Sequence, residues 1–198
     1  MNSDLSKSRA AVRRELRGRR RALSRSERML ASRRVAANVD HIFRLKAGQR
    51  IALYAAMPEE LDAAPLIELA IARGCEIYLP RIDRHTGCIH FTASDGATRP
   101  NHLGIDEPSG RRTIGARWLD LVFLPLVGFD AHGLRLGMGG GYYDRTFAFL
   151  NLRNAWRAPR LIGIAYQLQH VTHIEAQPHD VRLDAVVTEV GLAYKHIS

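Results

Sequence analysis

The segment DLVFLPLVGFDAHGLRLGMGGGYYDR, residues 120–145, contains a strand, a glycine cluster and the start of a helix, in this order. After Asp120, residues 121–125 form an unbroken apolar run that ends at Pro125, so 120–125 is typical of a strand buried on both faces of a parallel sheet. Residues 142–152 are expected to be helical. In an open α/β sheet, ligands bind beyond the carboxyl ends of strands, beside helix N-termini. The glycines therefore lie where such a protein would bind its ligand.

Strand-like and helix-like patterns alternate along the rest of the chain. Further strands are expected over 50–57, 75–80, 88–93, 160–166 and 184–189, and helices over 7–22, 24–43 and 62–74. Ser24 and Glu27 have the spacing of a capping box, and Asp62 is the expected N-cap of the third helix. The alternation predicts a single domain over 1–198 with a three-layer α/β/α fold and a mainly parallel sheet. Its N-terminal segment, about residues 7–44, is basic and helical.

The composition is that of a soluble globular protein, with 46% apolar and 25% charged residues among 198. No apolar run approaches the roughly 20 residues that span a bilayer, and the N-terminus lacks the hydrophobic segment of a signal peptide. Cys75 and Cys88 have neither metal-ligand spacing nor the density of a disulfide scaffold. We therefore expect a cytoplasmic protein without a membrane partner, with both thiols idle in a reducing compartment.

Positive charge is concentrated near the N-terminus. The formal net charge is +9, and residues 1–50 contain fifteen Lys and Arg against four Asp and Glu. A basic arm suggests an anionic partner, such as a nucleotide, a polyanionic metabolite or a nucleic acid, whereas a solvated helix face is the alternative. Residues 1–42 contain no Phe, Tyr or Trp on which bases could stack, so no nucleic-acid partner is expected. Binding of DNA or RNA with a steep salt dependence would revive that possibility.

The glycine cluster has two interpretations. Glycines let backbone N–H groups approach a phosphate, with Arg135 and Arg145 as nearby sources of positive charge. Asp144 would suit Mg²⁺, which proteins usually hold with one or two carboxylates and phosphate oxygens. The spacing matches neither a Walker loop nor a dinucleotide-binding motif, and a tight glycine turn into a helix is the alternative.

Five stretches together resemble the 5-formyltetrahydrofolate cyclo-ligase family, also called methenyltetrahydrofolate synthetase. They are LPLVGFDAHGLRLGMGGGYYDR (124–145), HDVRLDAVVTE (179–189), KSRAAVRRELRGRRRALSRSERMLASR (7–33), YAAMPEELD (54–62) and LGIDEP (103–108). The first, with its Tyr-Tyr-Asp, is the most specific, and the resemblance covers nearly the whole chain. It implies the fold shared with sugar-phosphate isomerase and CoA-transferase-like proteins, and a monomer that acts on small molecules.

The resemblance also implies a reaction: ATP- and Mg²⁺-dependent cyclisation of 5-formyltetrahydrofolate to 5,10-methenyltetrahydrofolate, with release of ADP and phosphate. The formyl oxygen is a poor leaving group, and its phosphorylation by ATP would activate it. A neighbouring folate nitrogen would then attack the same carbon. In such a reaction the protein mainly positions the reactants and neutralises charge.

The residues that match the family's motifs take implied roles. The catalytic residues would be Arg135, Tyr143 and Asp144. The ATP-binding residues would be Arg9, Arg13, Arg135, Gly137, Met138, Gly139, Gly140, Gly141, Tyr142 and Tyr143. Lys7 could replace Arg9 if the helix register differs, since the family commonly has Lys there. The other arginines of this segment, including Arg19, Arg20 and Arg21, are expected to form a solvated face.

The implied folate-binding residues would be Tyr54, Met57, Glu60, Gly139, Gly141 and Tyr142. Glu60 would accept hydrogen bonds from the reduced pterin, and 103–108 would form another wall, although Leu103 stands where some members have an aromatic residue. Asp144 and Asp184 would hold Mg²⁺. Without the resemblance, Glu60 reads as an exposed loop carboxylate, Asp184 as a strand-capping acid, and the two tyrosines as core residues.

Two alternatives to the cyclo-ligase stay open at this point. One is another ATP-dependent enzyme on the same scaffold with a different acceptor, which the residues around Glu60 and the long loop 94–110 would decide. The other is a nucleic-acid-binding module built on the basic arm.

Overall fold

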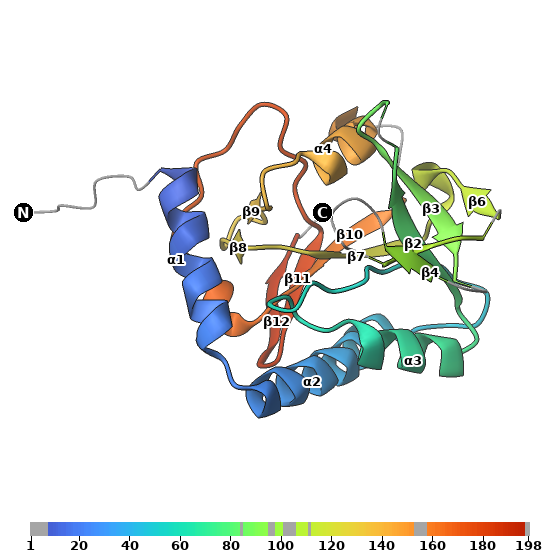
Figure 1. Ribbon diagram of the computed structural model, residues 1–198, viewed down its shortest axis with the longest axis horizontal. Helices are drawn as coiled ribbons and strands as arrows, with labels where there is room; N and C mark the ends of the chain where they lie inside the picture. Colours follow the sequence, from blue (N-terminus) through green and yellow to red (C-terminus); the bar gives the residue numbers. More distant parts are fainter. Residues whose placement is uncertain are drawn as a thin grey trace, which may run out of the picture.

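The computed structural model describes residues 8–83, 85–94, 98–100, 106–110, 112–152 and 158–196. Its centre is an eight-stranded sheet in the order β12-β11-β10-β7-β1-β2-β3-β6 (Figure 1). The strands are β1 (Arg50–Ala52), β2 (Glu76–Ile82), β3 (Ile89–Ala93), β6 (Thr113–Ile114), β7 (Leu121–Pro125), β10 (Arg160–Ile164), β11 (Ala185–Thr188) and β12 (Gly191–Lys195). Two short antiparallel pairs lie outside it, β4 (Thr98–Pro100) with β5 (Asp106–Pro108), and β8 (Gly128–Phe129) with β9 (Arg135–Leu136).

The pairing confirms a mixed α/β fold with a large, mainly parallel sheet. Strands β11, β10, β7, β1 and β2 are parallel, while β12, β3 and β6 add antiparallel edges. From β1 the chain first builds β2 on one side and later places β7 on the other. The strand order therefore reverses between β1 and β7, and ligands of open α/β sheets bind beyond such a reversal.

Helices cover both faces of the sheet. On one face, α2 (Arg25–Phe43) and α3 (Ala64–Ala72) pack on the apolar side chains of the parallel strands. On the other face, α4 (Tyr142–Phe147) and the 3₁₀ helices η1 (Ala116–Trp118) and η2 (Ala148–Leu152) cover a second apolar cluster. Strands buried on both faces read as the continuous apolar runs seen in the sequence. Within the described residues, none of the helices has the length and apolar character needed to cross a bilayer.

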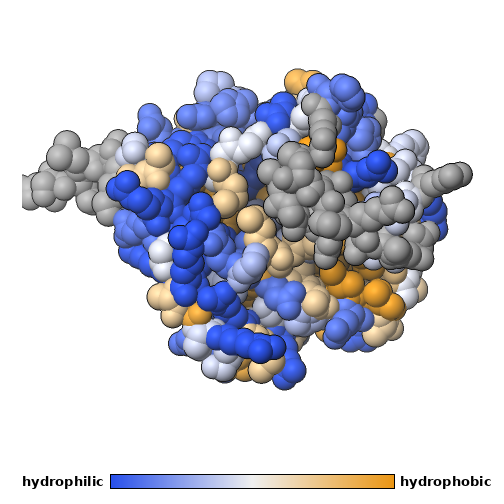
Figure 2. All heavy atoms as spheres, in the orientation of Figure 1, coloured by the Kyte–Doolittle hydropathy of each residue, from blue (hydrophilic) through white to orange (hydrophobic). Residues whose placement is uncertain are grey.

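Helix α1 (Arg9–Ala22) stands beside the sheet rather than on either face (Figure 1). It packs on β8 and on the 3₁₀ helix η3 (Gln167–Gln169), with Leu16 buried. Figure 2 shows hydrophilic side chains along this side of the molecule. Arg19 and Arg21 are exposed, as the expected solvated face requires, but Arg20 is only 1% exposed, so for this residue the expectation is wrong.

Of the two helix N-caps expected from the sequence, the structure has the first but not the second. The capping box of Ser24 and Glu27 is present and starts α2. Asp62 is not the N-cap of α3; Ala63 is, and Asp62 accepts a hydrogen bond from the N–H of Ala64. Pro65, in the first turn, has no backbone N–H that would need a hydrogen-bond acceptor, so this helix can start without a side-chain cap.

Several strands differ from expectation. The strand expected over 50–57 ends at Ala52, because the chain then leaves the sheet to form a turn. The pair β4 and β5 lies within the expected loop 94–110. Strand β12 has mostly exposed or half-buried residues and lacks the apolar pattern that predicts strands.

Candidate active site

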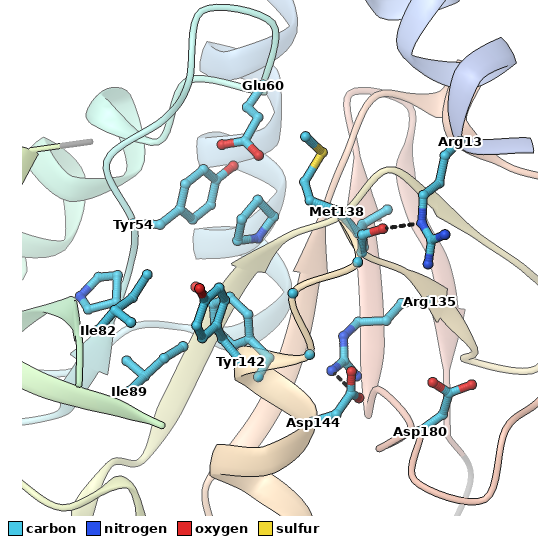
Figure 3. Close-up of a pocket in the computed structure, with 18 of the residues that line it drawn as sticks. Arg13, Tyr54, Glu60, Ile82, Ile89, Arg135, Met138, Tyr142, Asp144 and Asp180 are labelled. Atoms are coloured by element: carbon cyan, nitrogen blue, oxygen red, sulfur yellow. Dashed lines mark hydrogen bonds and ion pairs between the residues drawn. The ribbon is translucent and has the colours of Figure 1, made fainter. Parts of the chain in front are cut away.

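A cavity of about 560 Å³ lies at the carboxyl ends of β1 and β7, where the strand order reverses. Its walls come from the turn after β1, from the glycine segment before α4, from residues 177–180 and from α1 (Figure 3). The residues predicted one by one to bind ATP or folate all line it, and so does Asp144, the predicted metal ligand. They are Arg9, Arg13, Tyr54, Met57, Glu60, Arg135, Gly137, Met138, Gly139, Gly140, Gly141, Tyr142 and Tyr143. Residues from three distant parts of the sequence thus face one cavity.

The glycine segment 137–141 lines the cavity mainly with its backbone, because Met138 is its one residue with a side chain. Gly139 and Gly141 have φ values of 105° and 65°, in the region that favours glycine, and Gly141 is the N-cap of α4. Arg145 donates to the carbonyl of Gly140 (2.8 Å) and to that of Gly87 (3.0 Å), which ties the segment to the β2–β3 hairpin. A ligand can approach this backbone closely, as the phosphate interpretation requires.

Arg135 and Asp144 form an ion pair in the cavity wall. Nη2 of Arg135, whose side chain is 5% exposed, donates to Oδ1 of Asp144 over 2.6 Å (Figure 3). Nη1 of Arg135 donates to the carbonyl of Val181, whose N–H in turn donates to Asp144. Because Arg stays protonated in proteins, the pair places a fixed positive charge beside a carboxylate and the glycine segment.

The turn after β1 carries a nearly buried carboxylate. Glu60 accepts a hydrogen bond from the N–H of Met57 (3.0 Å), and burial raises its pKa above the ordinary value. The structure therefore excludes the alternative interpretation of Glu60 as an exposed loop carboxylate. Tyr54 donates its hydroxyl to the carbonyl of Leu61 (2.7 Å). A buried acceptor beside aromatic and apolar side chains suits a flat ligand with N–H donors.

Tyr142 and Tyr143 both line the cavity and pack on the apolar cluster beneath it. The ring of Tyr143 stacks on Phe147, and desolvation raises the pKa of its hydroxyl well above the ordinary value. Arg145 covers the ring of Tyr142. The two tyrosines are thus half-buried residues that pack against the core and line the cavity, and Tyr143 keeps its hydroxyl proton at physiological pH.

The N-terminal helix reaches the cavity with two arginines. Nε of Arg13 donates to the carbonyl of Gly137 (2.8 Å), and burial lowers the pKa of Arg13 without removing its charge. Arg9 pairs with Asp180 and donates to the carbonyl of Glu175, both over 2.8 Å. Lys7 lies outside the described residues, so the choice between Lys7 and Arg9 stays a prediction.

Asp184 does not lie at the cavity. It precedes β11, at the amino end of a strand parallel to β10, β7 and β1, whereas the cavity lies at the carboxyl ends. Its Oδ2 accepts a hydrogen bond from the N–H of Leu161 (2.7 Å). Contrary to the expectation, the structure thus does not bring Asp144 and Asp184 together around one metal ion. Asp184 instead matches the alternative interpretation, an acid that caps the start of a strand.

The cavity carboxylates are Glu60, Asp144 and Asp180. In the part of the chain that the structure describes, no three His, Cys, Asp or Glu side chains cluster to hold a metal. Asp144 nevertheless suits Mg²⁺ held with phosphate oxygens, because this ion commonly uses only one or two carboxylates together with phosphates.

Sequence reasoning missed several cavity residues. They are Ala55, Pro80, Ile82, Ile89, Pro125, Leu126, Gln177, His179 and Asp180. Most are apolar and carry no chemical signal, although Pro125 and Leu126 follow the strand that ends at the cavity. Asp180 lies in the stretch 179–189, four residues before Asp184. Leu103 lies outside the described residues, so its part in a wall is not tested.

Comparison with known proteins identifies relatives across nearly the whole chain. The model of the 5-formyltetrahydrofolate cyclo-ligase family matches residues 5–189. The chain is 32% identical over 182 residues to the 5-formyltetrahydrofolate cyclo-ligase of Haemophilus influenzae, covering 88% of this chain and 94% of that protein. It is 33% identical over 178 residues to the enzyme of the same name from Escherichia coli K12, covering 87% and 96%.

Solved structures agree with these sequence relatives. The 5,10-methenyltetrahydrofolate synthetase of Aquifex aeolicus superposes with a TM-score of 0.78 at 27% identity, covering 93% of this chain and 91% of that one. The 5,10-methenyltetrahydrofolate synthetase of Mycoplasma pneumoniae superposes with a TM-score of 0.73 at 26% identity, covering 92% and 99%. The similarity of fold thus extends over more than nine-tenths of the chain.

Proposed function

The chain belongs to the 5-formyltetrahydrofolate cyclo-ligase family, a family of ligases, and on this premise we propose that it converts 5-formyltetrahydrofolate to 5,10-methenyltetrahydrofolate with ATP as co-substrate. The observation that carries the proposal is the cavity at the strand reversal. A bare glycine backbone with arginines forms one side of it, and a buried carboxylate among apolar side chains forms the other. Two chemically different substrates would fit such opposed walls.

The reaction is balanced without further reactants. The γ-phosphoryl group of ATP is transferred to the formyl oxygen, and ADP leaves. The second folate nitrogen attacks the formyl carbon and loses its proton, the carbon–oxygen bond breaks, and phosphate departs. Neither step needs a protein nucleophile, so positioning and electrostatic stabilisation carry the catalysis.

The glycine side of the cavity would bind the triphosphate. In this proposal, residues 137–141 approach the phosphates with their backbone, and Arg13 and Arg135 neutralise oxygen charge. Asp144 would hold Mg²⁺ together with phosphate oxygens, and the ion would offset the charge of the transferred group. Tyr143, which keeps its proton, can donate a hydrogen bond toward the reacting oxygens.

The other side of the cavity would bind the folate. Glu60 would accept hydrogen bonds from the N–H and amino groups of the reduced pterin, while Tyr54, Met57 and Tyr142 line the space around it. Pro80, Ile82 and Ile89 extend this side with apolar surface. An acceptor inside an apolar pocket discriminates strongly, because a ligand without the matching donors leaves it unpaired.

The proposed function is tested by product formation. Purified protein is mixed with 5-formyltetrahydrofolate, ATP and Mg²⁺, and the near-ultraviolet absorbance of the methenyl product is followed. We expect absorbance to grow only when all three are present. Absence of product despite ATP binding would contradict the folate assignment and indicate another acceptor.

Glu60→Gln is expected to raise the KM for 5-formyltetrahydrofolate about tenfold, since a charged acceptor becomes a neutral one. The KM for ATP should stay within about twofold, because Glu60 comes from the turn after β1 and the proposed phosphate-binding residues come from another wall of the cavity (Figure 3). An equal rise in both constants would contradict the assignment of Glu60 to the folate.

The raised pKa of Glu60 adds a pH dependence. Its carboxylate form is lost as the pH falls through a value above the ordinary 4.5, so kcat/KM for the folate should fall on the acid side. Glu60→Gln removes the titrating group and should flatten this limb. Profiles of the two proteins over the same pH range test the prediction, and an unchanged acid limb in the variant would exclude Glu60 as its source.

A further inference from the structure

The face of α1 that looks toward the cavity carries a stripe of arginines. Arg9, Arg13, Arg17 and Arg20 follow one another at intervals of four, four and three residues, which places them on one side of a helix. Arg9 contacts the segment 175–180, Arg13 contacts the glycine segment, and the last two contact Glu59 in the turn after β1. One helix is therefore bonded to three walls of the cavity.

Glu59 accepts hydrogen bonds from three arginines of α1: Arg17 and Arg20 of this stripe, and Arg21 next to it. Its Oε1 accepts from Nε of Arg17 (2.6 Å) and Nη2 of Arg20 (3.2 Å), and its Oε2 accepts from Nε of Arg21 (2.8 Å). Burial raises the pKa of Glu59, but the hydrogen bonds from Arg17 and Arg21 outweigh it and lower the pKa to about 2. Glu59 is thus an anion at every pH at which the enzyme would work.

Glu59 does not line the cavity itself but belongs to the turn that does. The N–H of Glu60 donates to the carbonyl of Met57 (2.8 Å), and the N–H of Met57 donates to the carboxylate of Glu60. Arg28 of α2 adds a hydrogen bond to the carbonyl of Pro58 (2.6 Å). Any displacement of Glu59 would therefore move the backbone to which the Glu60 carboxylate is bonded.

The buried Arg20 connects this cluster to a second part of the cavity. Its Nη1 donates to the carbonyl of Leu126 (3.3 Å), and Leu126 lines the cavity beyond β7. A surface ion pair alone is worth little, but a carboxylate shared by three arginines, one of them buried, holds a fixed geometry. The turn after β1 and the end of β7 are both attached to α1 in this way.

We propose that Glu59 is a positioning residue, which anchors the turn carrying Glu60 to the arginines of α1 and so aligns Glu60 with the reduced pterin. The inference rests on the proposed function and deepens it. It assigns to α1 a role on the folate side of the cavity, in addition to the nucleotide side reached by Arg13.

The test variant is Glu59→Gln, which keeps the size and one acceptor oxygen but removes the charge. The KM for 5-formyltetrahydrofolate is expected to rise about fivefold, with the KM for ATP within about twofold. The matched control is Glu15→Gln, the same change on the outer side of α1, where Glu15 pairs with the exposed Arg19 over 2.6 Å. This control should leave both constants unchanged.

A double-mutant cycle separates positioning from a direct role. In a Glu60→Gln background, Glu59→Gln should raise the folate KM no further than about twofold, because the group it positions is already absent. A full fivefold rise in that background would overturn the proposal. So would a parallel rise of both KM values together with a lowered melting temperature, which indicates a merely structural role.

A milder variant covers the case in which Glu59→Gln does not fold. Arg21→Gln removes only the exposed member of the cluster and should raise the folate KM about twofold, in the same direction. No change in this variant, with Glu59→Gln unfolded, would overturn the proposal. Wild-type protein without any product would instead refute the proposed function, whereas active wild type with a fully normal Glu59→Gln would refute the positioning role alone.

Discussion

Replacement of Asp144 by Asn is expected to lower kcat about a thousandfold while the protein stays folded. The carboxylate lies in the cavity wall beside the glycine segment, and it is the acid best placed to act with phosphate oxygens on a divalent cation. Asn has the same shape and can still accept the hydrogen bond of the Val181 N–H. The neutral Asn cannot offset the positive charge of Arg135 or of a metal ion. The positive groups would therefore no longer be held in place around the phosphoryl group that is transferred.

The measurement combines kcat with thermal unfolding and with a titration of Mg²⁺. We expect half-maximal activity of Asp144→Asn to require more Mg²⁺. Its melting temperature should also fall, because the buried Arg135 loses its anionic partner, although the amide oxygen of Asn can still accept its hydrogen bond. Asp120→Asn is the matched control, because Asp120 lies at the amino end of β7, bonded to the N–H of Arg50. A kcat of Asp144→Asn within about threefold of wild type would exclude Asp144 from the reaction centre.

Replacement of Arg135 by Met is expected to have the largest effect on stability and to weaken ATP binding strongly. The side chain is nearly buried, and its loss removes the cationic partner of the Asp144 carboxylate and the side-chain donor to the Val181 carbonyl. Removal of one member of a buried ion pair costs about 3 kcal/mol or more, and the partial exposure of Asp144 sets the expectation at this lower limit. The KM for ATP should rise about a hundredfold, since a fixed charge at the phosphates is lost.

Chemical denaturation and ATP kinetics measure the two effects. Arg182→Met is a suitable control, because Arg182 is exposed and donates a 3.3 Å hydrogen bond to the carbonyl of His132, away from Asp144. The double variant Arg135→Met with Asp144→Asn should be more stable than Arg135→Met alone, since no unpaired charge remains. Wild-type stability of Arg135→Met would refute the stabilising role of the Arg135–Asp144 ion pair. A normal KM for ATP would refute the role of Arg135 in nucleotide binding.

Local sequence signals predicted the elements whose cause is local. The Ser24–Glu27 capping box starts α2 because its two hydrogen bonds lie within four residues. The apolar run ending at Pro125 is β7, since a strand buried on both faces leaves no polar side. The glycine cluster before Tyr142 faces the cavity as expected, because a strand end and a helix start flank it. Strand β12 was not predicted, as an edge strand with little burial leaves no pattern.

Long-range relations were harder to predict. Asp184 has the right chemistry for a metal ligand, but it precedes a parallel strand whose amino end points away from the cavity. Asp180, four residues earlier, lines the cavity instead. Arg20 belongs to a run of arginines that reads as solvated, yet it is buried because Glu59, distant in sequence, supplies its counter-charge.

The sequence by itself determined the class of fold, the family and the place of the glycine segment between a strand and a helix, because these depend on neighbouring residues and contiguous motifs. Only the tertiary structure decided which acids share the cavity and which arginine is buried. Both depend on which end of each strand faces the cavity and on which charges meet after folding. Desolvation makes an unpaired charge unfavourable, so the burial of Arg20 required a partner that no local pattern identifies.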